Sequence, residues 1–496
     1  MRIALTLLVA CMPTIQFAEA KFSGPYVPLD KNLDAQWVES LFQKGERKVY
    51  RGDELIYINM PCGGIGAGQV GVSGDGRICF TESVYNQMQK PNGGHGLSTG
   101  YHYLHPQMPE TKVENSFSVI IKGSGRKPKV FKLDKEGFDD IRFIGEYPIA
   151  KLDYRKTGEK LSVEISSEVF SPFVPLDLRS SANPVTVLKF SVKNTSRESV
   201  EISFLGWLKN IAFPEKSQVK YINTTKHAKK VSGVSFDMQP ADPKTTNQVI
   251  IHPQLGGFSL SVLDEDANCS AAVASDEEFI NSLNDGGDKS GTKKENFISN
   301  EPVGGGVSSC IHLNPQETKE VTFLITWFFP NFHEKGKRYG EMIKDPPGWV
   351  GRIYNNWYAG SFDVAEYIAV NFSKLYGETK LFRDTYFDNT LPYWLANRIT
   401  MPVSILAAGN VTIWQNGRMY AYEGIGFCAG TCGHVFNFVT AISKLFPKLE
   451  RSVRLMQDFN DSGKFSAYSE SGRINFRGYG ANKPEYTHSY ASDAQR

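Results

Sequence analysis

The chain has 496 residues, too long for one ordinary hydrophobic core, and this length predicts two or three domains. Its hydrophobic content of 41% and aromatic content of 12% are typical of a globular protein. With 55 basic and 53 acidic residues the net charge is only +2, which argues against a dedicated nucleic-acid-binding protein.

The first 20 residues have the pattern of a secretory signal. One basic residue is followed by a short apolar run, and Ala18-Glu-Ala20 supplies small residues for cleavage before Lys21. We therefore expect a secreted or periplasmic protein with a signal peptide over residues 1–20. Leu8-Val-Ala-Cys11 also resembles a bacterial lipoprotein box, so lipid attachment through Cys11 stays open. No stretch of about 18 apolar residues predicts a transmembrane segment.

Six cysteines remain after residue 20, which is few for this length, and we expect a fold that does not depend on a disulfide framework. They are Cys62, Cys79, Cys269, Cys310, Cys428 and Cys432.

Residues 50–330 carry a β pattern. Short runs alternate apolar and polar residues and are separated by Gly, Pro, Asn and Ser turns. Examples are Ser116–Ile121, Leu161–Ser166, Val185–Val192 and Val200–Phe204, and a last run ends before Pro330. Many short antiparallel strands predict a large β-sandwich. Residues 276–305 turn polar and rich in glycine, which predicts a surface loop.

Past Pro330 the period becomes helical. Five residues fall on one face of a helix opened by Asp363, namely Val364, Tyr367, Ile368, Phe372 and Leu375. A second helix near Leu391 has to end or kink at Pro402, and others precede Pro447 and begin near Lys448. We expect a signal (1–20), a β-sandwich domain (21–330) and a helical domain (331–496).

Glu423 is the most informative single residue. Tyr420 and Tyr422 alternate with small residues before it and glycines follow it, which predicts a strand that leads into a loop. Thr431 is the predicted N-cap of the helix that comes next. A carboxylate among aromatic residues is disfavoured unless it is paired, so Glu423 is either a structural ion or a catalytic group.

Two other motifs have a simpler interpretation. The glycines of Cys62–Gly68 match neither dinucleotide nor Walker A spacing and predict a bulge or a close approach of backbone. Gly96–Gly100 matches the nucleophile elbow around Ser98, but no strand precedes it and no helix follows, so a loop is the better prediction.

Two histidine groupings give weak metal signals. His95, His102 and His105 lack an H-E-x-x-H pattern, and Cys428 and Cys432 with His434 lack a second pair of soft ligands. We predict no metal and leave a Cys/His nucleophile pair open at the second grouping.

Three stretches resemble glycoside hydrolase family 116, the group of the non-lysosomal glucosylceramidase, and in particular its secreted bacterial branch. The first is Gly63–Gly68 followed by Gly74–Arg77, and the second is Phe170–Asp177 with Asn183–Val185 and Phe190–Asn194. The third is Tyr422–Asn437 with Leu445–Arg451, which is similar to the family's catalytic segment.

The resemblance implies a β-sandwich packed on an (α/α) toroid, a retaining β-glycosidase mechanism on a carbohydrate or glycoside, and no cofactor. Glu423 matches the nucleophile, paired in such enzymes with a second carboxyl about 5–5.5 Å away. His434 stands where relatives carry an aspartate that contacts sugar hydroxyls, so the sugar preference stays open.

The family's acid/base aspartate has no match after Glu423. A double ring of helical hairpins needs on the order of 200 residues. We therefore expect an incomplete toroid and little turnover of unactivated glucosides by this chain.

A non-catalytic carbohydrate-binding protein is the alternative function. Trp414, Tyr420 and Tyr422 would then stack on sugar faces without chemistry. A serine hydrolase at Ser98 is a weaker third hypothesis.

Overall fold

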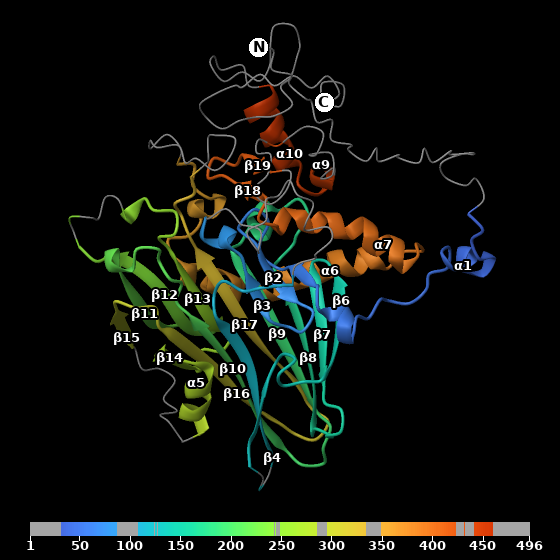
Figure 1. Cartoon of the computed structure of the whole chain (residues 1–496), viewed down its shortest axis with the longest axis horizontal. Helices are drawn as coiled ribbons and strands as arrows, with labels where there is room; N and C mark the ends of the chain where they lie inside the picture. Colours follow the sequence, from blue (N-terminus) through green and yellow to red (C-terminus); the bar gives the residue numbers. More distant parts are fainter. Residues whose placement is uncertain are drawn as a thin grey trace, which may run out of the picture.

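In the computed structural model two antiparallel sheets pack face to face, and the helices that follow Pro330 lie together on one side of them (Figure 1). The structure describes residues 31–86, 108–123, 125, 127–242, 244, 249–284, 295–333, 349–422, 431 and 441–459. The predicted signal peptide with Cys11, the Ser98 motif and the histidines at 95, 102 and 105 lie outside these residues.

The smaller sheet has five strands in the order β14-β16-β10-β4-β5. Their bounds are β14 Asn268–Val273, β16 Gly304–Leu313, β10 Val200–Lys209, β4 Asn115–Gly123 and β5 Lys129–Lys132.

The larger sheet has nine strands in the order β15-β11-β12-β13-β17-β9-β8-β7-β6. Their bounds are β15 Asn296–Ser299, β11 Val219–Ala228, β12 Val231–Pro240, β13 Gly257–Val262, β17 Thr318–Phe328, β9 Val185–Asn194, β8 Val163–Phe170, β7 Ile149–Arg155 and β6 Asp140–Glu146.

Aromatic side chains fill the space between the two sheets. Phe190 of the larger sheet stacks on Phe204 of the smaller one, with ring centroids 5.2 Å apart. Phe117 meets Phe323 edge to face at 5.5 Å. The predicted β-sandwich is therefore confirmed.

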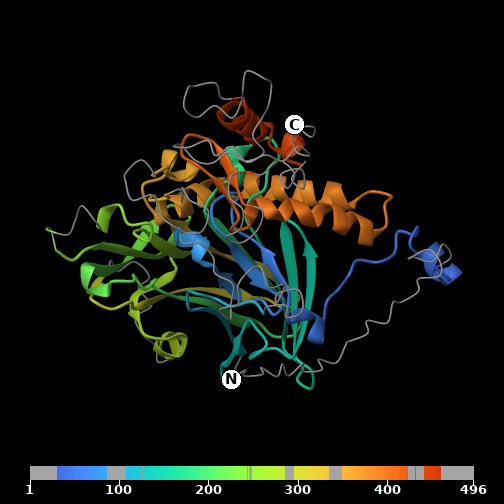
Figure 2. The same ribbon diagram turned by 45° about the horizontal axis from the view of Figure 1, so that its top comes forward.

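Helix α6 (Ser361–Phe387) covers the other face of the larger sheet, where it packs on β12, β13 and β17 (Figure 2). All six residues of β13 are buried in consequence, including the serines at 259 and 261. The Thr326 hydroxyl of β17 donates to the Ser361 carbonyl at 2.7 Å. The central strands thus have no solvent face.

A three-stranded sheet of β1 (Asn59–Pro61), β2 (Val70–Ser73) and β3 (Ile78–Phe80) carries the glycine motif between its first two strands. A Cβ on Gly64 would lie 2.0 Å from the Asn183 carbonyl oxygen. Gly66 has φ +64°, and its amide donates to the carbonyl of residue 406 at 2.8 Å. The predicted close approach of backbone is confirmed, and it joins the sandwich to the helical part.

The helical predictions after Pro330 hold in their main features. α6 begins at Ser361, and the Asp363 carboxylate accepts from the Ala359 amide at 3.0 Å across its first turn. α7 (Tyr393–Thr400) ends two residues before Pro402 and continues as a 3-10 helix, Met401–Ala407. The two later helices are α9 (Ala441–Leu445) and α10 (Pro447–Val453).

Short helical segments complete the described secondary structure. They are α1 (Ala35–Ser40), α3 (Leu178–Ser181), the 3-10 turns Gly52–Leu55, Glu82–Tyr85, Lys216–Gln218 and Ile353–Asn356, and a π turn, Arg454–Asp458.

The prediction of a surface loop over residues 276–305 is wrong for residues 276–284 and 296–299, while residues 285–294 lie outside the described residues. Helix α5 (Asp276–Asn284) begins there, and β15 and the first residues of β16 follow. Phe279 is buried against Trp207 and Val273, because it fills the space above a glycine of β16 where a Cβ would not fit. The polar composition of this stretch masked a one-sided helix.

Within the part of the chain that the structure describes, no helix has the length and apolar character needed to cross a membrane.

Candidate active site

A short hairpin carries the chain toward Glu423. Its strands are β18 (Val411–Ile413) and β19 (Met419–Ala421), which lie above α6 in Figure 1. Gly417 in the turn has φ +88°, which favours glycine, and its amide donates to the Trp414 carbonyl at 2.8 Å. The strand predicted before Glu423 is confirmed, and Glu423 itself lies outside the described residues.

Tyr422 and Thr431, the described residues on either side of 423–430, are both held by hydrogen bonds. The Tyr422 amide donates to the Asn410 carbonyl at 2.8 Å, and the Asn410 side chain donates back to the Tyr422 carbonyl at 3.2 Å. The Thr431 amide donates to the Ala421 carbonyl at 2.8 Å, while its hydroxyl accepts from the Ala421 amide at 3.1 Å. Tyr422 and Thr431 therefore both lie at the end of β19. Thr431 is the predicted N-cap of the helix that follows it. Residues 432–440 lie outside the described residues, so the N-cap stays a prediction.

The three aromatic residues of the hairpin form one packed row. Trp414 and Tyr420 have ring centroids 4.9 Å apart, and Tyr422 meets Tyr420 edge to face at 5.6 Å. The Arg418 guanidinium lies 4.7 Å from the Trp414 ring centre and donates to Gln457 at 3.1 Å. Trp414 is only 2% exposed, so its position favours support of the row. Half-buried Tyr422, the residue before Glu423 in the sequence, ends the row.

A buried arginine ties this hairpin to the glycine motif. Arg352 is 1% exposed and forms a β-bridge to Trp414. Its guanidinium donates to Asn86 Oδ1 at 2.9 Å, the Gly66 carbonyl at 3.0 Å and the Ser83 carbonyl at 3.1 Å. One side chain therefore holds two segments of the sandwich, the glycine motif and the turn at residues 82–86, against the hairpin.

Burial lowers the pKa of Arg352, and its electrostatic interactions with Tyr354 and Tyr422 act in the opposite direction. A guanidinium stays protonated even so, because it is the most basic side chain in proteins. No carboxylate in the described ranges forms an ion pair with it. The end of the aromatic row thus lies near a buried positive charge, which favours the ionised form of a nearby carboxylate.

A comparison with family profiles matches residues 59–375 to one described as "beta-glucosidase 2, glycosyl-hydrolase family 116 N-term". The match runs from β1 into α6 and takes in more than half of the 496 residues. The chain belongs to glycosyl-hydrolase family 116. The resemblance seen in the sequence motifs is therefore confirmed.

Solved structures similar to this family 116 chain are remote. A protein described as a putative kojibiose phosphorylase from the human microbiome has a TM-score of 0.35 and 10% identity, over 73% of this chain and 42% of its own. A family 36 α-galactosidase from Geobacillus stearothermophilus has a TM-score of 0.22 and 8% identity, over 57% of this chain and 41% of its own. This chain thus spans less than half the length of either protein. No curated protein matches it.

Of the residues predicted for the family 116 site, Trp414 and Tyr422 are described, while Glu423, His434 and the cysteines at 428 and 432 are not. The sequence reasoning missed Arg352. Its signal is present, however, because Arg352 is an isolated charge between apolar residues, the same pattern that singled out Glu423.

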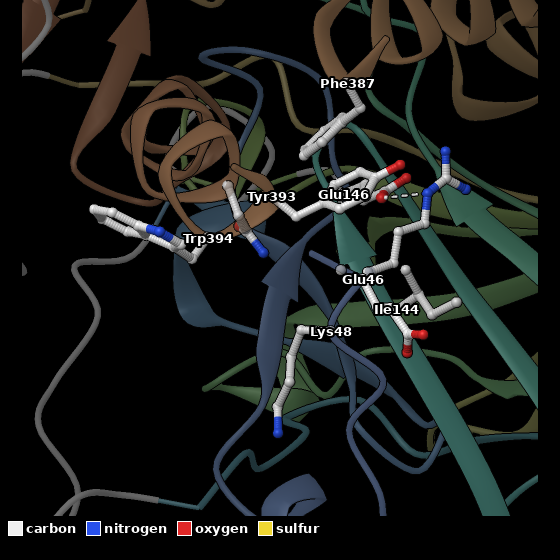
Figure 3. Close-up of a pocket in the computed structure, with 10 residues that line it drawn as sticks. Glu46, Lys48, Ile144, Glu146, Phe387, Tyr393 and Trp394 are labelled. Atoms are coloured by element: carbon white, nitrogen blue, oxygen red, sulfur yellow. Dashed lines mark ion pairs between the residues drawn. The ribbon is translucent and has the colours of Figure 1, made fainter. Parts of the chain in front are cut away.

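A second polar feature lies at the edge of the region matched to family 116. Figure 3 shows a pocket between the segment 46–48, the end of β6, and helices α6 and α7. Arg47 Nε lies 3.2 Å from Glu146 Oε1 in its wall. The Tyr393 amide donates a hydrogen bond to the Lys44 carbonyl at 3.0 Å. The residues around this pocket therefore also hold the segment 44–48 against helix α7.

The pocket is too small to bind a sugar. It holds about 50 Å³, whereas ligand sites measure about 300–1,000 Å³. Space of this size and polarity suits a few water molecules. We therefore assign it to the fastening of the N-terminal segment and place the candidate active site at the hairpin.

The Glu146→Gln variant tests the electrostatics of this pocket. Burial raises the pKa of Glu146, and the Arg47 guanidinium only partly opposes it. A carboxyl whose folded pKa lies above its unfolded pKa binds its proton more tightly in the native state. The free energy of unfolding of the wild type, relative to Glu146→Gln, should therefore rise as the pH falls through that folded pKa.

Urea unfolding at about pH 7.5 and at about pH 5 measures this difference. Glu54→Gln is the matched control, because hydrogen bonds from Lys48 and the Arg51 amide lower the pKa of Glu54. The wild-type advantage over this variant should therefore change with pH in the opposite direction. A wild-type advantage over Glu146→Gln that shrinks on acidification would show that Arg47 outweighs burial.

Proposed function

We propose that this protein is a retaining β-glycosidase that acts on a β-glucoside or a related sugar, with Glu423 as its nucleophile. The family 116 match over residues 59–375 carries the proposal. A retaining enzyme attacks the anomeric carbon with an ionised carboxylate and forms a glycosyl-enzyme, which water then hydrolyses.

The hairpin geometry supports the role of Glu423. The residue follows Tyr422 directly, and Tyr422 is fixed by two hydrogen bonds to Asn410. Arg352 is paired by a β-bridge with Trp414 of this hairpin, and a buried positive charge near a carboxylate favours its ionised form. A side chain on a fastened strand end is also held more precisely than one on a free loop.

We propose further that Tyr422 and His434 contact the sugar, with Trp414 supporting Tyr422 through Tyr420, which packs against both. Tyr422 has the more accessible ring of the aromatic row, since Trp414 and Tyr420 are both buried. His434 can hydrogen-bond a sugar hydroxyl with either ring nitrogen.

The domain organisation belongs to the same proposal. We assign residues 1–20 to a secretory signal, 21–330 to the sandwich domain and 331–496 to part of an (α/α) toroid. Helices α6 and α7 follow one another along the end of the sandwich and contact each other (Figure 2). The packing of α6 on β13 and β17 makes it the element that connects the two domains.

A covalent probe tests the function. The full chain is incubated with a 2-deoxy-2-fluoro-β-glucoside that carries a dinitrophenyl leaving group, which departs without acid assistance. We expect one added fluoroglucosyl group by intact-mass measurement, mapped to Glu423 by peptide analysis. Glu423→Gln should take no label, and Glu366→Gln, on the exposed side of α6, should be labelled like the wild type.

Labelling of a different carboxylate would reject Glu423 as the nucleophile. Sugar binding without any covalent label, unchanged in Glu423→Gln, would instead favour a carbohydrate-binding protein.

A further inference from the structure

Three side chains with different ligand atoms meet on the outer face of the smaller sheet. Cys310 and His312 are two residues apart on β16, so their side chains point to the same side of the sheet, and both are exposed. Glu201 of β10 stands directly opposite His312 in the antiparallel register. The thiol, imidazole and carboxylate therefore share one patch of surface.

The distances suit one metal ion. The three ligand atoms all lie within 4.8 Å of one another, and His312 Nδ1 is 3.8 Å from Glu201 Oε2. Tetrahedral zinc with bonds of about 2.0–2.3 Å separates its ligands by about 3.3–3.8 Å. Small side-chain rotations close the remaining difference, and exposed side chains make them at little cost.

Neighbouring groups hold two of the ligands in place. Lys122, opposite Glu201 on β4, lies 3.4 Å from Glu201 Oε1 and leaves Oε2 turned toward His312. Lys319 Nζ donates to the His312 carbonyl at 2.7 Å, which fixes the backbone there. Such outer contacts orient the ligands of metal sites in general.

We propose that Glu201, Cys310 and His312 bind Zn²⁺, with water as the fourth ligand. A sulfur, a nitrogen and a carboxylate oxygen form a donor set for zinc and not for Ca²⁺ or Mg²⁺, which take oxygen ligands. Binding releases the thiol proton of Cys310 to solvent as the sulfur–zinc bond forms.

This site is separate from the candidate active site. Glu201 pairs with Lys122, next to Gly123 at the end of β4. In Figure 1 the label of β4 is at the bottom of the molecule, whereas β18 and β19 lie at its top. The proposal therefore does not depend on the glycosidase function.

Cobalt provides the spectroscopic test. The full chain is titrated with Co²⁺ under reducing conditions, and we expect a near-ultraviolet thiolate-to-cobalt charge-transfer band that Zn²⁺ abolishes. Cys310→Ser should remove the band. His312→Gln and Glu201→Gln should weaken Zn²⁺ binding by at least about 10-fold.

Cys269→Ser is the matched control, because Cys269 lies on the neighbouring strand β14 and outside the cluster. The charge-transfer band should therefore persist in this variant. Urea unfolding without metal verifies that each variant is folded. A wild type without the band overturns the proposal. A band that survives Cys310→Ser but is lost in Cys432→Ser also overturns it, since the metal then belongs to the other Cys/His grouping.

Discussion

Replacing Arg352 with alanine is expected to lower the free energy of unfolding by about 3–5 kcal/mol. The substitution leaves the Gly66 carbonyl and Asn86 Oδ1 without their donor, and the Ser83 carbonyl keeps only the Asn86 amide at 3.4 Å. Each orphaned acceptor costs about 1–3 kcal/mol, and release of the buried charge offsets part of the sum. The guanidinium also packs 4.2 Å from the Phe332 ring centre, so its loss leaves a cavity.

Chemical denaturation of the full chain measures this effect. Arg352→Lys keeps the charge but cannot reach three acceptors with the geometry of a guanidinium, so we expect an intermediate loss. Arg398→Ala is the matched control, an exposed arginine on α7 whose removal should change stability by less than about 0.5 kcal/mol. If Arg352→Ala proved as mild as this control, the arginine would not hold the hairpin to the sandwich.

A Gly64→Ala substitution is expected to destabilise the protein by about 3 kcal/mol or more. The added Cβ would lie 2.0 Å from the Asn183 carbonyl oxygen and 2.8 Å from its carbon, and both are backbone atoms that no side-chain rotation can move away. Relief requires separating the glycine motif from the turn at Asn183, and the hydrogen bond from the Ile65 amide to the Ser181 carbonyl would break.

Gly377→Ala is the control for this second prediction. Gly377 lies on the exposed side of α6, and no atom lies within 4 Å of the position that an alanine methyl group would take there. Alanine should therefore stabilise the helix by about 0.5–1 kcal/mol. The two alanine variants should shift the urea midpoint in opposite directions. Equal shifts would mean that Gly64 relieves no backbone contact.

Local periodicity was enough to predict much of the fold. The alternating runs at 116–121 and 185–192 became β4 and β9, and the apolar spacing from Val364 to Leu375 became the buried face of α6. Both patterns depend on residues close together in the chain, so they are visible without a structure. The strand before Glu423 was predicted for the same reason.

The burial of polar residues was decided by packing. Ser259 and Ser261 alternate with apolar residues, a pattern typical of a strand with one face in solvent. In the structure α6 packs on this strand, and both serines are fully buried. Residues 276–284 look polar enough for a loop, yet Phe279 anchors a helix, with Ile280 and Leu283 packed beside it, once Trp207 and Val273 provide a surface.

The sequence by itself determined the sandwich, the helices after Pro330 and Glu423 as the residue to test. Only the tertiary structure decided that Arg352 joins Gly66 to the hairpin, and that Glu201 meets His312 across two strands. The physical reason is the same in both cases. Hydrogen bonds and ligand geometry act over a few ångströms, and strand register and packing bring those atoms together from distant parts of the chain.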